Sequence, residues 1–160
     1  MMGFLITHGS LEPAAEFATL CGASLSLYWA GMVLNDVYDL EQDQQERPQR
    51  PIPSGRISHQ SAQVVGYSLL LCGVLLAWLA AGLASTALPL AGVIGTCLAL
   101  AIWTYDRFKQ HAPWCAPVLI GVCRALNVLL GMSTVAVDKT IVSSMFGELA
   151  FCIGLYMAGI

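Results

Sequence analysis

Five long apolar stretches constrain what this chain can fold into more than any other feature. They are Ala14–Leu34, Ser61–Leu83, Ala87–Trp103, Cys115–Val135 and Ile141–Ile160. At about 1.5 Å per residue, most are long enough as helices to cross a hydrocarbon core of about 30 Å. Within a bilayer only helices or closed barrels satisfy every backbone group, and the alternation typical of barrel strands is absent from the sequence. We therefore predict an all-α, polytopic transmembrane helix bundle with about five crossings.

Composition excludes most classes of soluble protein. Apolar residues make up 57% of the chain and charged residues only 11%, which is less than half the usual share in soluble domains. The formal net charge of −3 does not suit a protein that binds nucleic acid, so no nucleic-acid partner is expected. The lipid bilayer is the expected environment.

Basic residues in the predicted connections indicate how the bundle is oriented. Arg47, Arg50 and Arg56 fall between the first and second stretches, and Arg107 and Lys109 fall between the third and fourth. Connections rich in Lys and Arg remain on the cytoplasmic side of a membrane. We therefore expect an integral, multi-pass membrane protein in which both connections lie on the cytoplasmic face.

The segment 35–56 carries the strongest signal for function. It holds 8 of the 17 charged side chains of the chain within 22 residues. If the first helix continues past its apolar stretch, Asp36, Asp39 and Asp43 lie on one helical face, and Asn35 lies one turn before Asp39. Carboxylates that lie together repel unless a cation joins them, and Mg²⁺ prefers oxygen ligands. The spacing favours a site for Mg²⁺ and a diphosphate. A solvated helix end that sets the topology is the alternative.

The residues after this acidic run predict a shaped loop. Three prolines between residues 48 and 53 prevent a helix there, and Ser58 is a plausible N-cap for the next one. The loop presents Arg47, Arg50 and Arg56 close to the carboxylates, and guanidinium groups suit phosphate oxygens. Setting the topology and binding anionic lipid headgroups are the alternative roles of these arginines.

One cation lies inside a predicted crossing. Arg124 is in the middle of the fourth stretch, and Asn127 follows on the same helical face. A central arginine costs at least about 2.5 kcal/mol on insertion scales, so it should face the interior of the bundle or a water-filled cavity. Its partner could be a diphosphate, a carboxylate of the acidic run or Glu148. Substrate binding and a structural ion pair both remain open as its role.

The acidic run and its loop resemble the first aspartate-rich motif of the UbiA superfamily of intramembrane prenyltransferases. The residues that carry the resemblance are Asn35-Asp36-x-x-Asp39-x-x-x-Asp43 and Arg47-Pro48-x-Arg50-Pro51-Ile52-Pro53-Ser54-Gly55-Arg56. Within the superfamily the chain is most similar to the UbiA-like EboC group. That likeness is carried by Val33-Leu34-Asn35-Asp36-Val37-Tyr38-Asp39 and by Arg124-Ala125-Leu126-Asn127.

The resemblance implies a bundle of about nine helices around a lipid-facing cavity. Members transfer an isoprenoid chain from a prenyl diphosphate to an aromatic or other lipophilic acceptor, and Mg²⁺ binds the diphosphate. By that likeness the metal and the diphosphate would be held by Asn35, Asp36, Asp39 and Asp43, with the three aspartates catalytic. The stretch that ends at Lys109 resembles the family's Tyr-x-x-x-Lys motif, so Lys109 is a candidate diphosphate contact.

The family also carries a second motif, D-x-x-x-D, far downstream of the first. Neither Asp106 nor Asp138 is followed by an acid four residues later, and the last apolar stretch reaches Ile160 without an anchor residue. We therefore expect residues 1–160 to form part of a longer prenyltransferase domain. Two other interpretations stay open. One is a non-catalytic member that binds or transports an isoprenoid or pigment-precursor lipid, and the other is an inactive fragment.

Overall fold

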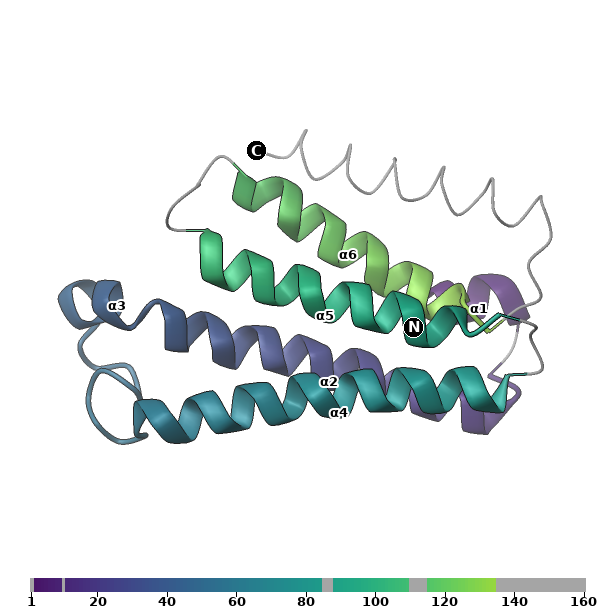
Figure 1. Ribbon diagram of the computed structural model, residues 1–160, viewed down its shortest axis with the longest axis horizontal. Coiled ribbons are helices and arrows are strands. Elements are labelled where there is room, and N and C mark those ends of the chain that lie inside the picture. Colours follow the sequence, from purple (N-terminus) through teal and green to yellow (C-terminus); the bar gives the residue numbers. More distant parts are fainter. Residues whose placement is uncertain (1, 10, 85–87, 110–114, 135–160) are drawn as a thin grey trace.

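The computed structural model describes residues 2–9, 11–84, 88–109 and 115–134, which form six helices and no strand (Figure 1). The helices are α1 (Met2–His8), α2 (Ala14–Tyr38), α3 (Leu40–Glu46), α4 (His59–Leu83), α5 (Leu90–Phe108) and α6 (Ala116–Met132). The prediction of an all-α fold is confirmed for these residues. The fifth predicted crossing, Ile141–Ile160, lies outside them.

Two helices of the described part are long and apolar enough to cross a membrane. They are α2 and α4, with 25 residues each. Helix α6 is apolar but has only 17 residues, and α5 has 19. The prediction of about five crossings is therefore not confirmed, whereas its first two crossings coincide with α2 and α4.

Close contact between α2 and α4 forms one side of the bundle (Figure 1). The buried face of α4 consists of small residues, namely Ala62, Gly66, Gly73, Ala77 and Ala80. A Cβ added at Gly73 would lie 2.6 Å from Leu27 Cγ and 3.2 Å from the carbonyl oxygen of Ala23. Small residues allow helices to approach this closely inside a membrane, where burial of apolar surface between helices gives no advantage over lipid. The exposed face of α4 carries large apolar side chains such as Leu71 and Leu75, which suits contact with lipid.

Helices α5 and α6 form the other side of the bundle. Helix α5 packs on α4, α6 and α2, and α1 packs on α6 (Figure 1). Three helices, α2, α5 and α6, therefore face one another across the interior.

The first crossing extends past Leu34, but it does not run unbroken through the acidic run. Helix α2 ends at Tyr38, and Asp39 adopts φ −87° and ψ 7° before α3 begins. That ψ lies outside the helical range, so α3 leaves the line of α2 (Figure 1). Hydrogen bonds still cross the break, because Asp39 N donates to Asn35 O at 3.0 Å and Asp43 N donates to Asp39 O at 2.8 Å. The expectation of one continuous helical face is corrected to two short faces that meet at Asp39.

The proline-containing loop folds into consecutive turns, as the sequence predicts. Ser54 N donates to Arg50 O at 2.9 Å, and Ile57 N donates to Pro51 O at 3.1 Å. Gly55 has φ +76°, in the left-handed region that favours glycine. Ser58 Oγ accepts a hydrogen bond from Ser61 N at 3.0 Å, which confirms the predicted N-cap of α4.

The contact at Gly73 predicts that even a methyl group will destabilise the bundle. We expect Gly73→Ala to lower the free energy of unfolding by about 1–3 kcal/mol, because the added Cβ overlaps Leu27 and crowds the backbone of Ala23. Gly82→Ala is the matched control, since no atom of the described residues lies within 4 Å of its added Cβ. Thermal unfolding of the purified protein in detergent measures both variants. Equal melting temperatures for the two would contradict the close approach of α2 and α4.

Candidate functional site

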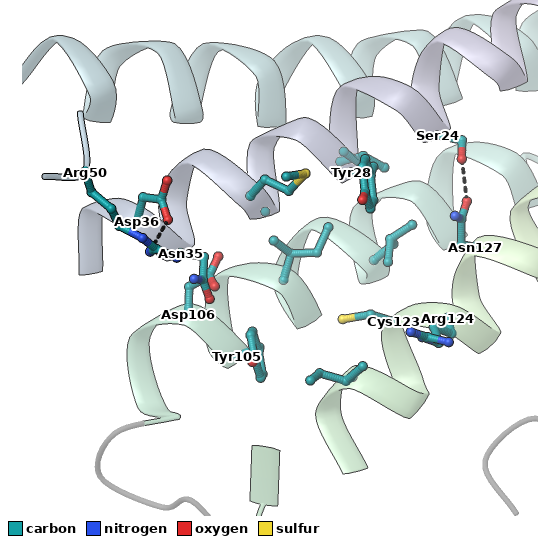
Figure 2. Close-up of a pocket in the computed structure, with 16 residues that line it drawn as sticks. Ser24, Tyr28, Asn35, Asp36, Arg50, Tyr105, Asp106, Cys123, Arg124 and Asn127 are labelled. Atoms are coloured by element: carbon teal, nitrogen blue, oxygen red, sulfur yellow. Dashed lines mark hydrogen bonds and ion pairs between the residues drawn. The ribbon is translucent and has the colours of Figure 1, made fainter. Parts of the chain in front are cut away.

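A cavity of about 480 Å³ opens between α2, α5 and α6 (Figure 2). This volume is typical of sites for small molecules. Asn35, Asp36 and Arg50 line one end, and apolar side chains such as Ile102 line the middle. Ser24 lies at the other end, eleven residues earlier on α2, which is about 16 Å along a helix. The cavity is therefore long and mostly apolar, with polar groups concentrated at its ends.

Arg50 joins two carboxylates of the acidic run. Its Nη1 lies 3.0 Å from Asp36 Oδ1 and 2.7 Å from Asp43 Oδ2. The hydrogen bond to Asp43, with the nearby negative charges, raises the pKa of the Arg50 guanidinium above its usual value. The turns of the loop thus place Arg50 across the junction of α2 and α3, as the sequence predicted for a loop arginine.

Lys109 neutralises the other half of the acidic run. Its Nζ lies 2.7 Å from Asp39 Oδ2 and also donates a hydrogen bond to Asn35 Oδ1. Asn35 Nδ2 donates to the same Asp39 oxygen at 3.0 Å. The Lys109 side chain is only 10% exposed. The structure therefore brings Lys109, at the end of α5, into contact with two residues of the acidic run.

The oxygen donors of the acidic run suit Mg²⁺ chemically, but these described side chains are not arranged as a preformed metal site. Within the described part of the chain, no three His, Cys, Asp or Glu side chains are grouped so that they could hold a metal ion. Instead Asp36 and Asp43 pair with Arg50, and Asp39 pairs with Lys109. Mg²⁺ usually takes one or two protein carboxylates and completes its shell with water and phosphate oxygens. The residues therefore fit an ion that arrives with a phosphate ligand.

The other predicted site residues fall into two groups. Arg124 and Asn127 line the cavity from α6, and Asn127 Oδ1 accepts a hydrogen bond from Ser24 Oγ at 2.8 Å (Figure 2). Arg47 and Arg56 are exposed in the loop and form no ion pair with any residue in the described ranges. The predicted residues that line the cavity are Asn35, Asp36, Arg50, Arg124 and Asn127.

Two residues at the polar end were not predicted from the sequence as site residues. Tyr105 and Asp106 of α5 both line the cavity, and the Tyr105 ring centroid lies 5.6 Å from Lys109 Nζ. Asp106 is 2% exposed, and its Oδ2 has no hydrogen-bond partner in the described structure. The available signal was its position, because it is the one acid within the Tyr-x-x-x-Lys stretch.

The pairing of Arg50 with two carboxylates predicts that this arginine holds the loop in place. We expect Arg50→Gln to speed tryptic cleavage of the Arg56–Ile57 bond several-fold, because the loop then opens more often. The bonds after Arg47 and Arg50 precede proline and resist trypsin, so cleavage within the loop reports on Arg56. Arg47→Gln is the control and should leave the rate unchanged. Mass spectrometry measures the cleavage rates. Equal rates for the two variants would contradict the proposed role of Arg50 in holding the loop in place.

Comparison with known proteins identifies relatives of the chain. The profile of the UbiA prenyltransferase family matches residues 1–160. A digeranylgeranylglyceryl phosphate synthase of Methanococcoides burtonii is 30% identical over 139 residues, covering 82% of this chain and 47% of the relative. The enzyme of that name from Methanospirillum hungatei is 34% identical over 132 residues, covering 82% and 44%. That of Ignicoccus hospitalis is 33% identical over 123 residues, covering 77% and 38%.

The chain spans less than half the length of these curated relatives. No solved structure matches it. The match to the family profile covers every residue. It therefore includes the acidic run, the proline-containing loop that follows it and the stretch that ends at Lys109. These findings confirm the resemblance to the superfamily. The chain belongs to the UbiA prenyltransferase family.

Proposed function

We propose that the protein acts as a Mg²⁺-dependent intramembrane prenyltransferase, which moves an isoprenoid chain from a prenyl diphosphate to a lipophilic acceptor. The observation that carries the proposal is an apolar cavity that ends at an array of carboxylates and cations. Asn35, Asp36 and Arg50 line that end, and Lys109 and Asp39 adjoin it through Asn35. A prenyl diphosphate has the matching form, with a charged head and a long apolar chain.

The head of the donor would bind where Arg50 and Lys109 now hold the carboxylates. Their charged N–H groups suit phosphate oxygens, and Asp36, Asp39 and Asp43 with the Asn35 amide supply hard oxygen ligands for a divalent cation. Mg²⁺, when bound there, neutralises charge on the diphosphate. The isoprenoid chain would lie along the apolar lining of α2, α5 and α6.

The same groups would assist the chemical step. As the bond between C1 of the donor and its diphosphate oxygen breaks, the electron pair moves onto the diphosphate, where Arg50 and Lys109 stabilise the added charge. The apolar cavity wall keeps water away from the electron-poor carbon. The acceptor then forms the new bond to that carbon and releases a proton.

The substrates and the orientation in the membrane are also part of the proposal. The relatives are named for digeranylgeranylglyceryl phosphate, so geranylgeranyl diphosphate is the first donor to test, and a lipid acceptor is favoured over a soluble one. We also infer a multi-pass protein with the acidic run on the cytoplasmic side. The exposed Arg47 and Arg56 beside that run support this orientation.

Removal of the motif carboxylates should abolish Mg²⁺-dependent turnover. We expect Asp36→Ala and Asp39→Ala to lower the release of pyrophosphate from geranylgeranyl diphosphate by at least about a hundredfold, because the cation loses its protein ligands. Glu41→Gln is the control, since Glu41 is an exposed acid on α3 outside the cavity. The assay uses protein in lipid nanodiscs that also contain a lipophilic acceptor, with and without Mg²⁺. Unchanged activity in both alanine variants would exclude the catalytic role of these aspartates.

The same assay distinguishes catalysis from binding alone. If the wild-type protein binds geranylgeranyl diphosphate but releases no pyrophosphate, the non-catalytic binding of an isoprenoid lipid replaces the transferase proposal. The ion pairs that already neutralise the motif carboxylates are the observation that favours this second function.

Loss of the Lys109 ammonium should weaken binding of the donor head. We expect Lys109→Met to raise the Kd for pyrophosphate in the presence of Mg²⁺ by about 10–100-fold, which is typical for removal of a charge-assisted hydrogen bond. Arg107→Gln is the control, because this basic residue near the same end of α5 is exposed and does not line the cavity. Isothermal titration in nanodiscs gives both constants. An equal rise in this Kd for both variants would indicate a general effect of net charge and contradict a direct contact of Lys109.

A further inference from the structure

Asp106 is a buried acid that the proposed donor site does not use. It lies on α5 and lines the polar end of the cavity with Asn35 and Tyr105 (Figure 2). Its side chain is almost fully buried, and Oδ2 has no hydrogen-bond partner among the residues that the structure describes. A buried acceptor without a partner is unfavourable, so such a group in a cavity wall indicates a ligand that supplies the missing donor.

The neighbours of Asp106 show which groups can serve as that donor. Lys109 and Asp39 interact with it electrostatically, but they are already bonded to each other and to Asn35. A diphosphate is an unsuitable partner, because its oxygens are acceptors and carry the same sign of charge. A neutral hydroxyl is a suitable ligand group, because its O–H can donate to a carboxylate oxygen.

The surroundings of Asp106 indicate what carries this hydroxyl. Beyond the polar end, the cavity wall is formed by apolar side chains of α2, α5 and α6, including Leu98, Ile102 and Ile120. With only pyrophosphate at the polar end, a small polar alcohol would leave this surface without contacts, whereas a long apolar chain covers it. An alcohol that binds beside the whole donor shares this surface with the isoprenoid chain. The hydroxyl-bearing molecule is thus lipophilic.

We propose that Asp106 binds the acceptor, with its carboxylate accepting a hydrogen bond from the hydroxyl of a lipophilic alcohol or phenol. The inference rests on the proposed function for the identity of that alcohol as the acceptor. Asp106 lies beside the Asn35, Asp39 and Lys109 group, so the hydroxyl oxygen is held next to the head of the donor. Binding of the alcohol is therefore compatible with a diphosphate bound at the same time.

The test measures binding and does not require turnover. Full-chain protein in nanodiscs is titrated with tritiated geranylgeraniol and with its methyl ether, which cannot donate a hydrogen bond, at saturating Mg²⁺ and pyrophosphate. We expect the alcohol to bind at least about tenfold more tightly than the ether. Asp106→Leu should remove that difference, and Asp106→Asn should retain most of it because the amide oxygen still accepts. Thr96→Val is the matched control. Thr96 is a polar residue of α5 that bonds Trp78 and does not line the cavity.

Each outcome decides the proposal. Equal affinity of the wild-type protein for the alcohol and the ether would overturn it, with no variant needed. Displacement of the alcohol by Mg²⁺ and pyrophosphate would also overturn it, because the hydroxyl would then occupy the donor site. Retained pyrophosphate binding in the Asp106 variants shows that they are folded. A wild-type protein that binds the alcohol but never binds pyrophosphate would leave Asp106 as an alcohol site and refute the prenyltransferase proposal instead.

Discussion

Repulsion among the carboxylates of the acidic run is the constraint on which the site depends. Asp36, Asp39 and Asp43 lie within two helical turns, and no cation lies among them in the sequence. Neutralisation comes from elsewhere, through Arg50 of the loop and Lys109 at the end of α5. Each ion pair therefore fixes a tertiary contact as well as a charge. The loop is tied to the α2–α3 junction, and the end of α5 is tied to α2.

The packing of α4 determines where the cavity can lie. Its small residues allow α2 to pack closely against it. On the other side of α2, the row formed by Ser24, Gly31 and Asn35 faces α5 and α6 instead of α4. Larger separation there leaves room for a ligand. Helix α2 thus has one face that packs closely against α4 and another that lines the cavity. The acidic end of α2 lies on the cavity face.

The sequence predicted most of the charged residues that belong to the site and how neighbouring residues are arranged. It did not predict which of these residues pair with one another. Asn35 and Asp39 could be placed together because they are one helical turn apart, and Ser58 could be assigned as a cap by its type and position. The break at Asp39 was not predictable, because polar residues continue a helical pattern on both sides. The division of the carboxylates between two cations depends on the path of the loop. Asp106 was missed because a single acid forms no pattern, and its lack of a partner exists only in three dimensions.

The paired state of the site explains how an anionic diphosphate could enter at low energetic cost. A buried carboxylate without a counterion would be strongly unfavourable, so Arg50 and Lys109 stabilise the site before any ligand arrives. A diphosphate accompanied by a divalent cation offers each group a new partner of the correct sign. The carboxylates would then bind the metal in place of Lys109 or Arg50. Lys109 and Arg50 would bind phosphate oxygens in place of the carboxylates. Each of these groups keeps a partner of opposite sign during this exchange, whereas a diphosphate without its metal would displace the carboxylates and leave them unpaired. The ion pairs thus favour a ligand that brings its own cation.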